Sequence, residues 1–114
     1  MVTMTHYMKL RNEPFEAIKH GFKNIEMRLY DEKRSLINAN DIIVFTNTAT
    51  LENISCKVVN IYRYSTFEEL YRHHNKLSIG YKEDENANPD DMLVYYTKED
   101  IKKYGVVGLE ILVI

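Results

Sequence analysis

The sequence predicts an α+β fold in which a small mixed or antiparallel β-barrel carries helices at its rim. Apolar residues follow strand and helix periods in the order β-α-β-β-β-α-α-α-β. The middle strands are joined by connections too short for parallel crossovers. The longest expected strand, residues 54–64, changes its apolar parity near Val58, which indicates a bulge or bend of the kind that closes a small barrel.

The N-terminal part is expected to form a strand, a helix and a second strand. Residues 7–10 make the first strand, and Asn12 is expected to cap the helix that follows. Gly21 fits the left-handed residue that ends a helix. From Ile25 to Leu29, apolar and polar residues alternate, which predicts a half-buried strand with one polar face.

The remaining elements follow from shorter signals. Residues 31–37 are expected to form a loop or one helical turn, followed by a buried strand at 42–45. Ser65 and Glu68 have the spacing of a capping box and predict a second helix. The later elements are a long polar loop (81–91), two short helices starting at Pro89 and Thr97, and a largely apolar central strand (106–114).

Composition predicts a single domain over residues 1–114. With 45% hydrophobic and 28% charged residues, the chain can bury one core. No apolar run approaches the roughly 18 residues of a membrane span, and the N-terminus lacks a secretory pattern. A cytoplasmic protein without a membrane partner is therefore expected. The single cysteine, Cys56, lies in a strand-like run and is interpreted as a small buried side chain.

The charge balance limits the class of partner. A net charge of -2 and a pI of about 6.1 argue against a protein that covers a long stretch of nucleic-acid backbone, because such proteins are strongly basic. The best local group of cations is Lys23, Arg28, Lys33 and Arg34, but acidic residues are interleaved with them. One phosphate or one nucleotide fits this pattern, and a long duplex does not.

The octapeptide at residues 21–28, GFKNIEMR, carries the strongest functional signal in the chain. Glu26 and Arg28 share one face of the expected strand, about 6.5 to 7 Å apart. Lys23, in the preceding turn, can reach the same place. The three polar groups predict a site for a small polar ligand. Local sequence leaves one alternative open, a solvated ion pair worth about 0 to 1 kcal/mol.

Three segments resemble the ASCH (activating signal cointegrator homology) superfamily. Residues 21–28 match its GxKxxExR signature, and residues 31–45 resemble the segment that follows, except that Asn40 stands where a glycine is usual. Residues 95–108 are similar to the C-terminal block of small bacterial members. The resemblance implies a PUA-like β-barrel whose cleft at the signature binds RNA or a nucleoside-sized ligand.

The first function that the resemblance implies is RNA or nucleoside binding. Lys23 and Arg28 would then contact phosphate or a base edge, Glu26 would accept a hydrogen bond from a base amine, and an aromatic side chain would stack. The expected binding residues are Lys23, Glu26, Arg28, Lys33, Arg34 and Tyr96. No cofactor is expected, and the oligomeric state is left open.

The second implied function is that of an amidohydrolase that removes the acetyl group from acetylcytidine. The lysine, threonine and glutamate of such ASCH enzymes correspond here to Lys23, Glu26 and, as the nearest match, Glu99, so the nucleophile is missing. Glu26 would need burial to raise its pKa by more than the neighbouring cations lower it. Glu99 is otherwise a first-turn acid of a helix. A metal-assisted ribonuclease is the third hypothesis, although no clustered metal ligands lie near the signature.

Overall fold

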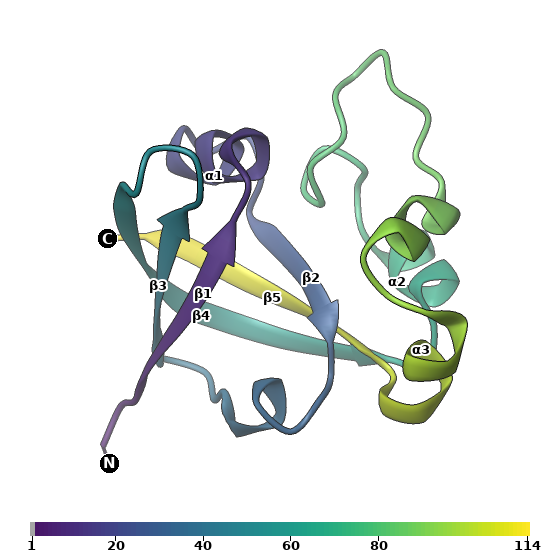
Figure 1. The fold of residues 1–114 in the computed structure, drawn as a ribbon, viewed down its shortest axis with the longest axis horizontal. Helices are drawn as coiled ribbons and strands as arrows, with labels where there is room; N and C mark the ends of the chain where they lie inside the picture. Colours follow the sequence, from purple (N-terminus) through teal and green to yellow (C-terminus); the bar gives the residue numbers. More distant parts are fainter. Residues whose placement is uncertain (1) are drawn as a thin grey trace.

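The computed structural model describes residues 2–114 and arranges them as a curled sheet with helices packed beside it (Figure 1). Over these residues there are five strands, three α-helices and two 3₁₀ helices. In chain order they are β1 (Thr5–Leu10), α1 (Asn12–Lys19), β2 (Ile25–Leu29), η1 (Arg34–Leu36), β3 (Ile42–Asn47), β4 (Asn53–Tyr64), α2 (Phe67–His73), η2 (Pro89–Val94), α3 (Lys98–Tyr104) and β5 (Val106–Val113).

The five strands form one mixed sheet in the order β1-β3-β4-β5-β2. β1 pairs with β3 in parallel, and the other neighbours are antiparallel. β5 lies between β4 and β2, so the prediction of a central C-terminal strand is confirmed. The register of β4 against β5 shifts between Val58 and Asn60, which confirms the predicted bulge. The sheet curls into a half-barrel, and the α+β class is confirmed.

The two edge strands, β1 and β2, are joined by side chains that reach across the gap between them, which we call the seam. Arg28 on β2 donates a hydrogen bond from Nη2 to the Lys9 carbonyl oxygen at 2.9 Å. Lys33 donates from Nζ to the Tyr7 carbonyl oxygen, also at 2.9 Å. Both carbonyls belong to β1, whose backbone pairs only with β3 on its other side. Two cations thus close the half-barrel where no strand does.

The core consists of two clusters of buried side chains, and β5 contributes to both. Phe15 and Ile18 of α1 pack into the hollow of the half-barrel with Phe45 and Val58. The second cluster joins β2 and β5 to the later helices through Ile25, Met27, Leu29, Phe67, Leu70, Ile79, Met92 and Val106. β2 is therefore covered on both faces, and only Arg28 in it remains half-buried.

Three local predictions need correction. The N-cap of α1 is Arg11, because Asn12 is already helical and its Oδ1 accepts a hydrogen bond from Asn47 Nδ2. The N-cap of α2 is Thr66 rather than Ser65, and its hydroxyl accepts a hydrogen bond from the Glu69 amide. β2 is buried rather than half-solvated, because later parts of the chain cover its polar face.

The predicted left-handed residue after the first helix is confirmed, and two other positions share its positive φ. Gly21 follows α1 with φ of 81°, and Gly105 follows α3 with φ of 72°. Asn40 also has positive φ, 76°, at the position where the resembling sequences have glycine. Asparagine tolerates this left-handed conformation better than other side chains, which explains the exchange. In residues 2–114 no helix combines the length and the apolar character that crossing a bilayer requires.

Candidate functional site

The three charged residues of the octapeptide meet at the start of β2. Lys23 donates a hydrogen bond from Nζ to Glu26 Oε1 at 2.7 Å. Arg28 donates from Nε to Glu26 Oε2, also at 2.7 Å. Each carboxylate oxygen of Glu26 therefore accepts a hydrogen bond from one cationic side chain. We call these three side chains the ion cluster. The prediction that they converge is confirmed, while the alternative of a solvated pair is wrong because the cluster is buried.

The ion cluster is buried, so its charges interact more strongly than those of a solvent-exposed ion pair. The side chains of Lys23, Glu26 and Arg28 are 9%, 5% and 14% exposed. Burial by itself would raise the pKa of Glu26, but the charges and hydrogen bonds of Lys23 and Arg28 outweigh it, so that pKa lies below its usual value. Burial would likewise lower the pKa of Arg28, yet the Glu26 carboxylate raises it. Glu26 and Arg28 therefore stay charged at neutral pH.

The segment after α2 packs against Lys23 and the start of β2 and holds them in place. The backbone amides of Asn24 and Ile25 both donate to the Ser78 carbonyl, at 3.1 and 2.9 Å. Gly80 lies directly against the lysine stem, since a Cβ at that position would be 3.2 Å from Lys23 Cδ and 3.8 Å from its Nζ. Gly80 also has φ of 111°, which favours glycine. The sequence pattern did not single out Gly80.

The ion cluster lies at the wall of a large cleft of about 1040 Å³. α1 borders this cleft on one side, β2 forms its base, and residues 77–85 together with 91–96 border it on the other side. Figure 1 shows the long connection between α2 and η2 standing beside the β2 end of α1. Of the predicted site residues, four line the cleft: Lys23, Glu26, Arg28 and Tyr96.

Aromatic side chains lie at different depths in the cleft. Phe22 and Tyr95, 76% and 55% exposed, stand at its mouth. Arg11 lies over the Tyr95 ring with its Cζ 5.1 Å from the centroid. Tyr96 is half-buried and stacks on Phe67 at a centroid distance of 6.0 Å. Burial raises the pKa of Tyr96 although Arg28 opposes it, so its phenol is neutral.

The charges that line the cleft nearly cancel. Five of the lining residues are Lys or Arg and six are Asp or Glu. A polyanion gains affinity mainly by exchanging counterions for an excess of protein cations, and this cleft has none. Its chemistry suits a flat, mostly uncharged group that makes specific hydrogen bonds at the ion cluster.

Three of the predicted site residues lie elsewhere. Lys33 caps the Tyr7 carbonyl at the seam, and Arg34 pairs through Nη1 with Asp31 Oδ2 at 2.8 Å. Glu99 is exposed in the first turn of α3. None of the three lines the cleft.

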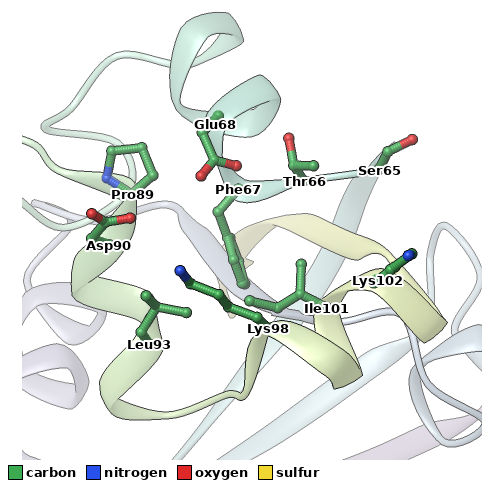
Figure 2. A pocket seen from close by; sticks show the side chains of 10 residues that line it. All are labelled: Ser65, Thr66, Phe67, Glu68, Pro89, Asp90, Leu93, Lys98, Ile101 and Lys102. Carbon is green, nitrogen blue, oxygen red and sulfur yellow. The ribbon is translucent and has the colours of Figure 1, made fainter.

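A second cavity, of about 330 Å³, lies between the start of α2, η2 and α3 (Figure 2). Lys98 and Lys102 line it together with Glu68 and Asp90, above the apolar side chains of Phe67 and Ile101. Figure 2 shows these charged groups around the rim, with Phe67 and Ile101 between them. No residue of the ion cluster reaches this cavity.

Cys56 and the two adjacent histidines lie outside the cleft. Cys56 is buried, as predicted, and burial raises the pKa of its thiol to about 11. His73 bonds through Nδ1 to the Glu69 carbonyl at 2.7 Å, and His74 bonds through Nε2 to the Tyr64 hydroxyl at 2.8 Å. Among residues 2–114, no three His, Cys, Asp or Glu side chains gather in a way that could hold a metal ion.

A family model, the ASCH domain, matches residues 8–114. The chain belongs to the ASCH domain family. This family is associated with RNA binding, and its PUA-like fold agrees with the curled half-barrel. The chain matches no curated protein.

Solved structures support the assignment to the ASCH family. The hypothetical protein PH0355 is 36% identical, with a TM-score of 0.82, and the match covers 97% of this chain and 100% of that one. PF0455 from Pyrococcus furiosus is 32% identical, with a TM-score of 0.76 and coverage of 97% and 98%. A ZmASCH variant from Zymomonas mobilis has the same fold at 14% identity, with a TM-score of 0.61 and coverage of 95% and 67%.

The octapeptide that resembles the ASCH signature occupies defined parts of this structure. Its glycine ends α1, its lysine and glutamate make the buried pair, and its arginine joins that pair to the seam. Sequence reasoning missed the part of the cleft that the later segments contribute, namely Gly80, Tyr81 and Asp91. The available signal in the sequence was a glycine and a tyrosine directly after the apolar Ile79.

Proposed function

We propose that this ASCH domain binds single-stranded RNA or a nucleoside, with one base held in the cleft at the ion cluster. The observation that carries the proposal is a buried, fully charged group on the wall of a cleft large enough for a nucleotide. Base recognition by single-stranded RNA binders combines stacking with hydrogen bonds to base edges, and both kinds of group line this cleft.

The ion cluster keeps hydrogen-bonding capacity for a ligand. An ammonium has three protons, and Lys23 uses one of them on Glu26. Arg28 uses Nε on Glu26 and one Nη2 proton on the Lys9 carbonyl, out of five guanidinium protons. A base carbonyl or ring nitrogen can accept from the free protons. A base amine can donate to the free lone pairs of Glu26.

Stacking is the second part of the proposal. Tyr96 has a fixed ring inside the cleft, since it rests on Phe67. Tyr95 and Phe22 at the mouth offer further flat surfaces for a neighbouring base. Each stacked base contributes about 1 to 3 kcal/mol in such complexes. With a cleft of balanced charge, most of the affinity is expected to come from stacking and base contacts, not from phosphate.

Fluorescence anisotropy with a labelled single-stranded RNA hexamer of mixed sequence tests the proposal. Lys23→Met is expected to weaken binding at least tenfold, because it removes donors and leaves Glu26 with one cation. Lys98→Met is the matched control, since Lys98 lines the other cavity. The slope of log affinity against log salt is expected to be shallow, near that of one or two phosphate contacts at about 0.7 each. Absence of saturable binding by the wild type, or equal loss in both variants, would refute the proposal.

The amidohydrolase hypothesis shares Lys23 and Glu26 and is separated by turnover. The lowered pKa of Glu26 makes it a weak general base, which disfavours hydrolysis by this residue. Incubation with acetylcytidine and chromatographic detection of cytidine decides between the two. Cytidine release that is lost in Lys23→Met would replace binding by catalysis, and further loss in Glu99→Ala would support the predicted role of Glu99. No arrangement of described residues supports the ribonuclease hypothesis.

A further inference from the structure

Beside the ion cluster, two tyrosines and an aspartate form a hydrogen-bonded chain on the cleft wall. The Tyr81 hydroxyl lies 2.6 Å from Asp91 Oδ2, and the Tyr71 hydroxyl lies 2.9 Å from the Tyr81 hydroxyl. All three residues line the cleft. We call Tyr71, Tyr81 and Asp91 the tyrosine relay. It connects α2, the long loop and η2.

The proton directions in the relay follow from its chemistry. A carboxylate only accepts, so Tyr81 donates to Asp91. The hydroxyl of Tyr81 has one proton, and Tyr71 must therefore donate to the Tyr81 oxygen. Burial, with further contributions from Tyr81 and Asp91, raises the pKa of Tyr71 well above its usual value, which keeps the phenol protonated. The groups left for a ligand are acceptors, namely lone pairs on Tyr71 and the free oxygen of Asp91.

The free oxygen of Asp91 is oriented but not occupied by the protein. Oδ2 is held by Tyr81, whereas Oδ1 has no protein partner within residues 2–114. The Asp91 amide also donates to the Asn88 carbonyl at 3.0 Å, which fixes the backbone of η2 at its start. Neighbouring Asp90 instead lines the smaller cavity. The two adjacent aspartates thus have different surroundings.

The position of the relay matches one part of a nucleotide. The ion cluster is almost fully buried and suits the far edge of a base, whereas Asp91 is exposed and Tyr81 half-buried. A base that enters edge first leaves its sugar nearer the mouth and its phosphates in solvent. Gly80 touches Lys23 and is followed directly by Tyr81, so the relay lies beside the ion cluster along the same wall. A sugar hydroxyl is the donor that this wall can receive.

We propose that Asp91, oriented by Tyr81 and Tyr71, accepts a hydrogen bond from the ribose 2′-hydroxyl and makes the cleft selective for RNA over DNA. The inference rests on the proposed function, since it assumes that a nucleotide occupies the cleft. Asp91 is a binding residue in this account, and the two tyrosines are positioning residues. The 2′-hydroxyl is the group by which a protein distinguishes the two nucleic acids at one site.

The experiment compares two labelled single-stranded hexamers of one sequence, an RNA and a DNA that carries deoxyuridine in place of uridine. The wild type is expected to prefer RNA by about tenfold, the value of one hydrogen bond to a charged group. Asp91→Ala is expected to bring the ratio close to one by weakening RNA binding while leaving DNA binding unchanged. Tyr81→Phe is expected to reduce the ratio partly, because Asp91 stays but loses its orientation.

Asp90→Ala is the matched control. It removes the same charge from the neighbouring residue, whose side chain lies outside the cleft. It is expected to keep the wild-type ratio. A wild type that binds both hexamers equally, or Asp91→Ala with an unchanged ratio, overturns the inference and leaves the proposed function standing. A parallel loss of RNA and DNA affinity in Asp91→Ala would indicate a structural role and also overturns it. Absence of binding to either hexamer refutes the proposed function itself.

Discussion

Two buried carboxylates in this chain have opposite surroundings, Glu26 in the ion cluster and Asp41 in the turn before β3. Asp41 accepts from the backbone amides of Met4 and Asn38, at 3.1 and 2.9 Å, and contacts His6 Nε2 at 2.9 Å. Burial would raise its pKa, but these hydrogen bonds outweigh it and lower the pKa. It lines neither cavity.

Burial and pairing do not by themselves identify a functional site. Both carboxylate oxygens of Asp41 bind groups of the protein itself, and these contacts hold the start of β1 against the turn before β3. Glu26 meets two cations that keep unused protons, and it does so at the wall of a cleft. The difference lies in what remains unsatisfied after folding.

The largest expected effect comes from removing the carboxylate of the ion cluster. Glu26→Leu leaves two buried cations without their partner, and we expect the free energy of unfolding to fall by about 3 to 5 kcal/mol. Urea unfolding followed by circular dichroism measures it. The double variant Lys23→Met with Glu26→Leu should recover part of this loss, because one unpaired charge is then gone.

Asp41→Ala provides the control that sharpens the comparison. It removes a buried carboxylate with at least as many protein partners, so stability should fall, yet RNA affinity measured below the unfolding transition should remain that of the wild type. If Asp41→Ala weakened RNA binding as much as Lys23→Met, the distinction between a structural and a functional carboxylate would be lost.

Acid is expected to weaken both regions together. The folded pKa values of Glu26 and Asp41 lie below the ordinary values of 4.5 and 3.8, so the unfolded chain binds more protons as pH falls. Their stabilising contribution is complete above those ordinary values and is lost as pH falls through the folded ones. Urea midpoints between pH 3 and 7 should therefore decrease toward acid. Equal midpoints across this range would contradict the lowered pKa values.

The smallest expected effect concerns the wall above Lys23. Gly80→Ala combines positive φ with a Cβ 3.2 Å from the lysine stem, and we expect a loss of stability of about 1 to 3 kcal/mol together with weaker RNA binding. Gly21→Ala is the matched control, since it has φ of 81° but nothing within 4 Å of the new Cβ. It should destabilise without the additional loss of affinity. Equal affinities in the two variants would show that Gly80 does not position Lys23.

Much of this fold could be predicted because its signals are local. The alternation around Ile25, the parity change near Val58 and the glycines after α1 and α3 each act over a few residues. The meeting of Lys23, Glu26 and Arg28 was predictable for the same reason, since they lie in one turn and strand.

The burial of the site could not be predicted, because its cover comes from distant sequence. Ser78 and Gly80 pack against Lys23 and the start of β2 from a segment with no periodic pattern. By sequence position Asp91 is a helix-start acid like its neighbour Asp90, and only the tertiary contact with Tyr81 distinguishes the two. The position of Lys33 and Arg34 away from the cleft likewise depends on how the chain turns after β2.

Arg28 also protects the free edge of β1 through its hydrogen bond to the Lys9 carbonyl. A strand edge with free carbonyls is a template on which another chain can add a strand, and natural sheets protect such edges with charged side chains. Here the guanidinium that faces the cleft is also the protecting group of β1. A substitution of Arg28 would therefore both weaken ligand recognition and expose a strand edge on which a second copy of the chain could pair.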